Sequence, residues 1–173
     1  MSEVCNQISI HEAFKRGDLD AVRSLLGNPP DFPNCLGPLA SSKIVLQYAI
    51  YHSPPQLVCA LLELGADPNY ADYAGFPSLF AALSTQRLER YEILELLLSF
   101  GADVQQRGIN DWTPLHYAVA QNDLRMIELL LAHGANPHAK TRIDHYSSPI
   151  EDAKKQSFSE AERLLAKLEK RRH

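Results

Sequence analysis

Histidine and cysteine are the residue types in this sequence with the strongest potential for metal chemistry, and there are seven histidines and three cysteines. His133 and His138 lie five residues apart across a predicted glycine-containing turn, a spacing that would not place both rings on one helix face. His145 lies in a further predicted loop. The cysteines show no C-x-x-C spacing and cannot all pair; they are Cys5, Cys35 and Cys59. The sequence therefore predicts no metal site and no cofactor.

A nucleophilic cysteine is the second kind of chemistry to consider. Cys35 lies in a proline-rich segment, GNPPDFPNCLGP (27–38), with no evident base beside it. The patterns G-x-S-x-G and H-E-x-x-H, a glycine-rich phosphate loop and an EF-hand loop do not occur in the sequence. We therefore expect an inert thiol and a protein that is not an enzyme. An enzyme with a site centred on Cys35 and a nearby histidine is the alternative.

The charge of the 173-residue chain is distributed unevenly around its net value of −4. Residues 163–173 carry five basic and one acidic side chain, a balance of +4, so the remaining chain carries −8. An acidic body repels a phosphate backbone, because nucleic-acid binding depends on clustered Lys and Arg. We therefore expect no nucleic-acid partner.

The sequence shows neither a secretory signal nor a membrane helix. Its first residues contain no basic stretch followed by a long apolar run, and charges interrupt every apolar stretch before the ~20 residues that a membrane helix needs. Three cysteines without a pairing pattern fit a reducing compartment. We expect a cytoplasmic protein without membrane contact, with a nuclear location or delivery into a host cell as alternatives.

A repeat organises the elements that must position these side chains. Three segments align directly, each with an apolar helical face followed by Gly-Ala-Asp or Gly-Ala-Asn: LVCALLELGADPNYAD (57–72), ILELLLSFGADVQQ (93–106) and MIELLLAHGANPHAK (126–140). A second, shorter helix carries an apolar residue in one slot at intervals of 36, 33, 36 and 35 residues: Ile10, Leu46, Leu79, Leu115 and Ile150. Such a period predicts an array of small repeats.

Local residue chemistry supports the repeat. Thr113 can cap the shorter helix through its hydroxyl, and Pro114 suits the first helical position, where no N–H is needed. We expect a slot for small side chains between helices, at Ala49, Ala82, Ala118 and Ala153. We expect left-handed helix ends at Gly65, Gly101 and Gly134. A buried helix face is predicted at Ile93, Leu94, Leu96 and Leu97.

The stretch DWTPLHYA (111–118), followed by LLLAHGA (129–135), resembles the ankyrin repeat, a unit of about 33 residues with a β-turn finger and two antiparallel helices. The resemblance implies an all-α fold, an α-solenoid of helix-turn-helix repeats with short β-turn or hairpin fingers. It also implies that the ring of His116 ties finger loops together. Pro77-Ser78 and Ile44-Val45 depart from the family's Thr-Pro. The prediction is a single domain, 1–173, with repeats at about 8–36, 39–71, 72–107, 108–140 and 143–173, the last closing the array.

The resemblance also implies where a partner binds, because finger tips and the ends of the first helices are the variable, exposed positions of such arrays. The predicted partner-binding residues are Tyr51, His52, Tyr73, Phe76, Ile109, Asn110, Trp112, Gln121, Asp144 and His145. Three of them are large aromatics at finger positions that ordinarily hold polar residues, and large aromatics commonly anchor protein interfaces. The alternative is that they pack across adjacent fingers and stiffen the array.

These observations predict a monomeric, non-enzymatic module that binds another protein through its concave finger and first-helix surface, as an adaptor or an inhibitor. A bacterial effector or toxin-neutralising protein that uses the same surface is one alternative. Self-association through Tyr73, Phe76 and Trp112 is another.

Two insertions distinguish the chain from a regular array. The proline-rich segment 27–38 is a long connection that is either functional or merely tolerated. The stretch STQRLERYE (84–92) carries three extra residues. For it we predict one helix extended by almost a turn, with Arg87 and Arg90 on the outside.

Overall fold

The computed structural model describes residues 10–38, 44–71, 76–143 and 146–167. Within these ranges the chain forms helices joined by turns, and it has no β-strand. The predicted all-α class is therefore confirmed. The chain divides into two compact units, residues 1–102 and 103–173. No helix in the described ranges is long and apolar enough to cross a membrane.

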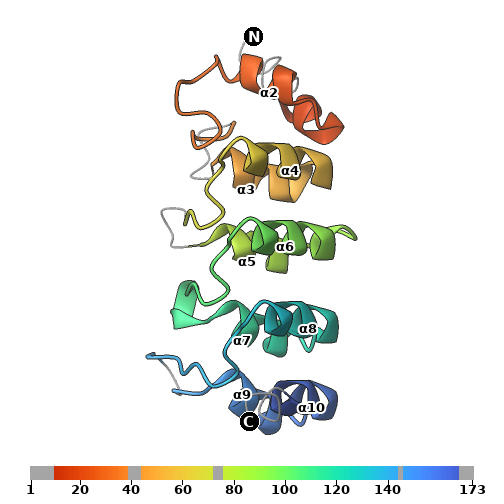
Figure 1. Cartoon of the computed structure of the whole chain (residues 1–173), viewed down its shortest axis with the longest axis vertical. Helices are drawn as coiled ribbons and strands as arrows, with labels where there is room; N and C mark the ends of the chain where they lie inside the picture. The colour runs from red at the N-terminus through yellow and green to blue at the C-terminus, as the bar shows by residue number, and fades with distance from the viewer. Residues whose placement is uncertain (1–9, 39–43, 72–75, 144–145, 168–173) are drawn as a thin grey trace. The chain divides into compact units, whose positions relative to one another are not determined.

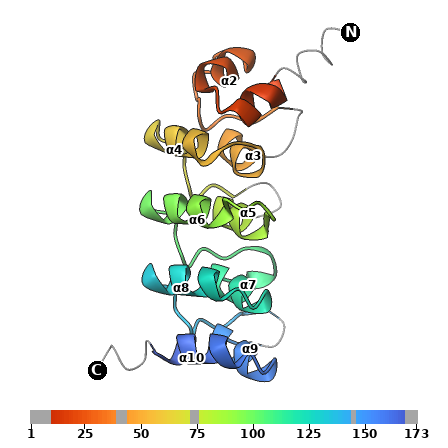
Figure 2. The same cartoon turned by 90° about the vertical axis from the view of Figure 1, so that its right-hand side faces the viewer.

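The first unit contains two rows of helices. It consists of a helical segment at 10–16 and of α2 (Leu19–Leu25), α3 (Val45–His52), α4 (Pro55–Glu63), α5 (Ser78–Ser84) and α6 (Arg90–Ser99). Consecutive helices form pairs, α3 with α4 and α5 with α6, and α3 packs on α5 while α4 packs on α6 (Figures 1 and 2). We call the earlier helix of each pair the first helix, and the segment before it the finger.

The second unit repeats this arrangement. A short 3-10 helix, η1 (Ile109–Asp111), precedes the pair α7 (Pro114–Ala120) and α8 (Leu124–Ala132), and the pair α9 (Pro149–Lys155) and α10 (Ser159–Lys167) follows. The first helices α7 and α9 pack on each other, as do the second helices α8 and α10 (Figure 1). Within each unit, therefore, neighbouring first helices lie side by side, and each finger comes directly before one of them in the chain.

Local residue chemistry explains where the first helices begin. The hydroxyl of Thr113 accepts a hydrogen bond from the backbone N–H of His116, and Pro114 is the first residue of α7, which confirms the predicted cap. Before α9, the Glu151 carboxylate accepts from the backbone N–H of Ser148 at 2.8 Å. Helices α3 and α5, whose fingers lack Thr-Pro, begin without a side-chain cap.

The core of each unit lies between its helices. The predicted slot for small side chains is completely buried, at Ala49, Ala82, Ala118 and Ala153. The apolar slot of the first helices is buried as well, at Ile10, Leu46, Leu79, Leu115 and Ile150. The buried face of α6 differs by one residue from the prediction, since Leu98 is buried and Leu96 is partly exposed. Small residues between first helices let the neighbouring backbones approach closely.

The second helices end in the predicted glycines, which have left-handed φ angles of 91°, 88° and 88° at Gly65, Gly101 and Gly134. The carbonyl group of each glycine accepts a hydrogen bond from an amide side chain about one repeat earlier. The donors are Asn34 to Gly65 at 3.0 Å, Asn69 to Gly101 at 3.1 Å and Gln105 to Gly134 at 3.2 Å. Helix ends that would expose orphan carbonyls are thereby tied to the preceding segment.

The proline-rich segment 27–38 is anchored to its surroundings. The Arg23 guanidinium lies 5.6 Å from the centre of the Phe32 ring. The Cys35 carbonyl accepts from the backbone N–H of Val45 at 3.1 Å, and Leu36 forms an isolated antiparallel bridge with Ile44. The end of the segment therefore contributes to the finger that precedes α3, and a second isolated bridge, Ala71 to Pro77, marks the finger before α5.

The prediction for the insertion at 84–92 is wrong. Helix α5 ends at Ser84, and residues 85–89 form an irregular connection before α6, so neither helix is extended by almost a turn. Arg87 does not point into solvent, because its Nη1 donates to the carbonyl of Ile50 at 3.0 Å. The last carbonyls of a helix have no intrahelical partner, and Arg87 from the insertion satisfies one such carbonyl of α3.

Candidate protein-binding surface

The finger before α7 is held by the buried carboxylate of Asp111. Arg107 Nη1 lies 2.6 Å from Asp111 Oδ2, and Arg142 donates from its backbone N–H to Oδ2 and from Nη2 to Oδ1, each at 2.6 Å. The hydrogen bonds from Arg142 are the main reason that the pKa of Asp111 is lowered to about 2. Because Arg142 follows Asp111 by 31 residues, this cluster joins two successive fingers of the second unit.

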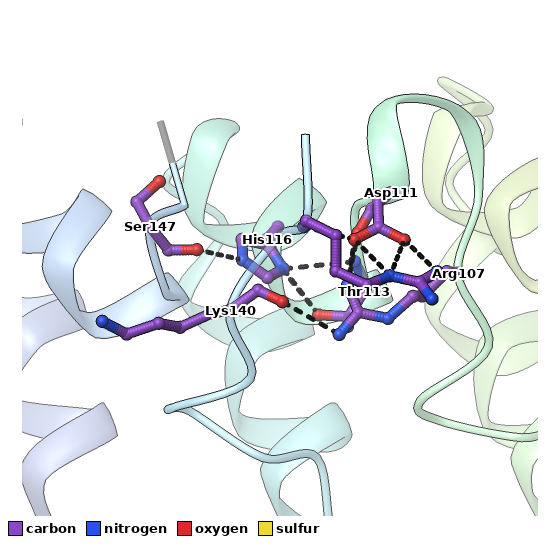
Figure 3. A network of polar contacts seen from close by, with 7 residues as sticks. Arg107, Asp111, Thr113, His116, Lys140 and Ser147 are labelled. Carbon is purple, nitrogen blue, oxygen red and sulfur yellow. Dashed lines mark hydrogen bonds and ion pairs between the residues drawn. The ribbon is translucent and has the colours of Figure 1, made fainter. Parts of the chain in front are cut away.

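The same cluster supports an unusual backbone. Asn110 and Asp111 have φ angles of 61° and 60°, a region that costs non-glycine residues free energy. Arg107 donates to the Asp111 carbonyl at 2.8 Å and, through Nη2, to the Lys140 carbonyl at 2.9 Å (Figure 3). These contacts stabilise the finger in one conformation, so that it presents its outer side chains from a defined support.

His116 lies between two fingers, as the resemblance implies. Its Nδ1 accepts from the backbone N–H of Thr113 at 3.1 Å, and its Nε2 lies 3.1 Å from the Ser147 carbonyl (Figure 3). An acceptor at Nδ1 and a donor at Nε2 require the neutral ring. Burial accordingly lowers the pKa of the His116 imidazole below its ordinary value. His116 therefore has a structural role.

Trp112 stands beside this buried histidine and reaches the surface. Its ring stacks on the His116 ring with the centroids 6.4 Å apart and the planes at 25°, yet its side chain remains partly exposed. Trp112 also borders a surface pocket of about 210 Å³, whose other lining residues are His116, Ala120, Thr141, Ser147, Asp152 and Gln156. Trp112 is therefore both packed and accessible.

In the first unit, aromatic rings gather around α3. Tyr48 is buried, and its hydroxyl lies 2.7 Å from His11 Nδ1. The ring of His52 is exposed, with its centroid 4.5 Å from that of Tyr48 and 5.2 Å from that of His11. Tyr51 is partly exposed and pairs with Ser84 through its hydroxyl at 3.1 Å. Two predicted residues, Tyr51 and His52, thus belong to one aromatic group.

Phe76 has direct contacts with other residues of the first unit. Its ring lies edge-on to the buried Phe80 with the centroids 5.9 Å apart, and its carbonyl accepts from Gln47 Nε2 at 2.9 Å. The Gln47 contact reaches back to the preceding first helix, α3. For Phe76, stiffening of the array is therefore the role with direct contacts to support it.

Asn110 and Gln121 are exposed, at the finger tip and at the C-cap of α7. Ile109 lies in η1, and its side chain is not among those described. Tyr73, Asp144 and His145 lie outside the described residues.

Comparison with known protein families agrees with this geometry. Residues 10–108 match the family model for ankyrin repeats in three copies, and residues 110–142 match the model for the single ankyrin repeat. The chain belongs to the ankyrin-repeat family. Ankyrin repeats bind other proteins in general, which places this chain among protein-interaction modules.

Relatives of this ankyrin-repeat chain come from viruses, bacteria and animals. An ankyrin repeat protein of fowlpox virus is 30% identical over 84% of this chain and 32% of its own length. The ankyrin repeat protein YahD of Escherichia coli is 27% identical over 88% of this chain and 92% of its own length. A mouse palmitoyltransferase is 38% identical over 53% of this chain and 14% of its own length. The chain thus spans about a third of the fowlpox protein and a small part of the palmitoyltransferase.

The environment of Cys35 does not favour a nucleophile. Its side chain is buried, and burial together with the Asp31 carboxylate raises the pKa of the thiol. A reactive cysteine needs the opposite, a lowered pKa in an electropositive and accessible place. In the described parts of the ankyrin-repeat chain, no three His, Cys, Asp or Glu side chains are grouped so that they could hold a metal ion.

Sequence reasoning missed the charged residues of the second unit, Arg107, Asp111, Arg142 and Asp152. Opposite charges separated by nearly one repeat length, such as Asp111 and Arg142, are the signal that could have found the finger contact. Asp152 offered no such signal, because its place beside Trp112 depends on how α7 and α9 pack.

Proposed function

We propose that this ankyrin-repeat chain binds another protein through the fingers and first helices of its repeats, and that it acts as an adaptor or an inhibitor of that partner. The observation that carries the proposal is the partly exposed Trp112 at the rim of a pocket in the second unit. Large aromatics such as Trp are frequent energetic anchors of protein interfaces.

The rigidity of the Trp112 finger supports this role. Two sets of contacts hold the segments around Trp112 before a partner arrives. One joins the Asp111 carboxylate to Arg107 and Arg142. The other joins the His116 ring to Thr113 and Ser147. A surface that is already ordered loses little conformational entropy on binding.

We assign the aromatic group of the first unit to the same function. His52 is exposed and Tyr51 partly exposed at the end of α3, and rings offer large contact areas with few rotatable bonds. We assign the remaining predicted finger and helix-end residues of each unit to the same function: Tyr73, Phe76, Ile109, Asn110, Gln121, Asp144 and His145.

The test is capture of partners from the native host with the immobilised chain, in wild-type form and as Trp112→Ala. A partner held through this surface should bind the variant at least ~2 kcal/mol more weakly, because Trp is a typical energetic anchor. The matched control is Phe100→Ala, which removes an exposed aromatic at the end of the second helix α6. It should retain the partner.

Thermal unfolding of each variant separates binding from stability. A partner that binds Trp112→Ala as tightly as wild type, or is lost equally from Phe100→Ala, contradicts the proposed surface. Loss of binding that merely follows loss of stability would support a stiffening role for Trp112 instead. Once a partner is known, its activity in the presence of the chain distinguishes an inhibitor from an adaptor.

A further inference from the structure

The pocket beside Trp112 has the size of a site for one side chain. It belongs entirely to the second unit, and its volume of about 210 Å³ lies below the roughly 300–1,000 Å³ typical of small-molecule sites. Space of this size corresponds to roughly seven water molecules at about 30 Å³ each. It therefore suits a protruding side chain of a bound protein rather than a separate ligand.

The lining of the pocket is polar and carries one formal charge. The lining residues with a hydroxyl or amide side chain are Thr141, Ser147 and Gln156, and the one with a carboxylate is Asp152 in α9. His116 contributes a ring that is already bonded on both nitrogens. An apolar side chain would remove the Asp152 carboxylate from water without a partner, which costs free energy.

Asp152 has no counter-ion in the described part of the chain. Its carboxylate makes no hydrogen bond or ion pair there, and it is partly buried. Two arginines of the adjoining fingers have another partner, since Arg107 and Arg142 pair with Asp111. Lys140 lies 3.7 Å from the Glu151 carboxylate. The charge that would complement Asp152 must therefore come from outside these contacts.

Trp112 provides the second feature that a cation requires. A Lys or Arg side chain is attracted to the face of an indole ring, and the Trp112 ring has the His116 ring beside it, with the centroids 6.4 Å apart. The remaining exposed part of the ring borders the same pocket as the Asp152 carboxylate. A π face and an unpaired carboxylate around one small pocket form a site with a clear preference for positive charge.

We propose that this pocket binds a lysine or arginine side chain of the partner protein, with Asp152 as its counter-ion and Trp112 as the wall on which it lies. The inference rests on the proposed function and specifies which partner segment this unit recognises, a segment with an exposed basic residue. Asp152, rather than the exposed charges elsewhere on the unit, then determines the charge preference.

The test uses single-residue probes and the indole N–H signal of Trp112 in ¹H–¹⁵N NMR spectra. Because the chain has one tryptophan, this signal is unique and reports on the pocket directly. The probes are the N-acetyl methylamides of lysine and arginine, with those of norleucine and glutamate as neutral and acidic controls. The lysine or arginine probe should shift the signal in a saturable way, and the two controls should not.

Two variants then separate the pocket from general surface charge. Asp152→Asn keeps the shape of the side chain and should weaken the binding of the basic probe by about tenfold or more, because the probe loses its charged hydrogen-bond acceptor. Glu128→Gln removes one charge from an exposed position on the second helix α8 and should leave the binding of the probe unchanged. Unchanged thermal unfolding of Asp152→Asn shows that the fold is intact.

The inference is overturned if neither basic probe shifts the signal saturably, if norleucine shifts it equally, or if Asp152→Asn binds like wild type. Failure here is distinct from failure of the proposed function. A partner lost from Trp112→Ala but insensitive to Asp152→Asn would leave the binding surface standing and remove only the basic side chain. If a basic probe binds but no partner depends on Trp112, the preference of the pocket for a basic side chain stands and the proposed function fails.

Discussion

Single side chains in the second unit control both its rigidity and its response to pH. His116 is kept neutral by burial and by the two hydrogen bonds that join its ring to Thr113 and Ser147. Asp111 is kept charged by hydrogen bonds from Arg142 and Arg107. The two residues therefore lose their native contacts in different pH ranges. Asp111 contributes stability above pH 3.8, which is lost as the pH falls towards about 2.

We expect His116 to make the stability of the chain fall below about pH 6.5. In the unfolded chain the imidazole takes up a proton near its ordinary pKa of 6.5, whereas in the fold its pKa is lower. As the pH falls below 6.5, the unfolded state therefore binds more protons than the folded state. The free energy of unfolding is not reduced by His116 above pH 6.5, and it declines below that pH. Urea unfolding between pH 7.5 and 5 measures this decline.

Replacement of the ring isolates its contribution from that of the other histidines. His116→Gln should be less stable than wild type at pH 7.5, in the usual range of about 0.5–3 kcal/mol, but should lose less on acidification. His133→Gln removes an exposed histidine and is the matched control, which should be about as stable as wild type at pH 7.5. Parallel pH curves for His116→Gln and wild type would contradict the assignment.

At the scale of elements, each helix is stable because one face is buried against its neighbours. Helix α6 is only 10 residues long, which is too short for independent stability in water. Its contacts with α4 and α5 must therefore supply most of its stabilisation, through Ile93, Leu94, Leu97 and Leu98.

The adjacent leucines of α6 give a direct test of this face. Leu97→Ala should lower the free energy of unfolding by about 2–5 kcal/mol, because it leaves a cavity at a fully buried position. Leu96→Ala removes the same atoms from a partly exposed position and should cost clearly less. Chemical unfolding followed by circular dichroism measures both. Equal losses would contradict the assignment of Leu97 to the buried face of α6 and of Leu96 to its edge.

At the scale of the whole molecule, charge opposes association between copies. The chain has a net charge of −4 and an expected mass of 19.4 kDa. Copies of like charge repel, and a stable interface between them would need roughly 1,000 Å² or more of complementary surface.

We therefore expect a monomer in solution. Light scattering coupled to gel filtration should give a mass near 19.4 kDa, unchanged as the protein concentration is raised. A mass that approaches twice this value would favour self-association, and its loss in Trp112→Ala would assign the contact to the proposed surface.

Periodicity made much of this fold predictable from the sequence. The slots of Leu46, Leu79 and Leu115 recur at repeat spacing, and the Thr113-Pro114 cap and the terminal glycines depend on neighbours within a few residues. Local rules of this kind act through backbone geometry, which the residue types already determine. The repeat boundaries stay predictions, since the two compact units are larger than single repeats.

Contacts between distant residues were decided by tertiary structure. Arg87 donates to the Ile50 carbonyl, 37 residues earlier in the chain. The insertion for which a longer helix was predicted is therefore an irregular segment that caps the end of α3. Asp111 and Arg142 meet across 31 residues, and Asp152 and Trp112 border one pocket only because α7 packs on α9. The sequence by itself determined the family, the helices and the kind of function. The packing of helices determined which charges are paired and which carboxylate is left to receive a partner, because both depend on side chains brought together from different repeats.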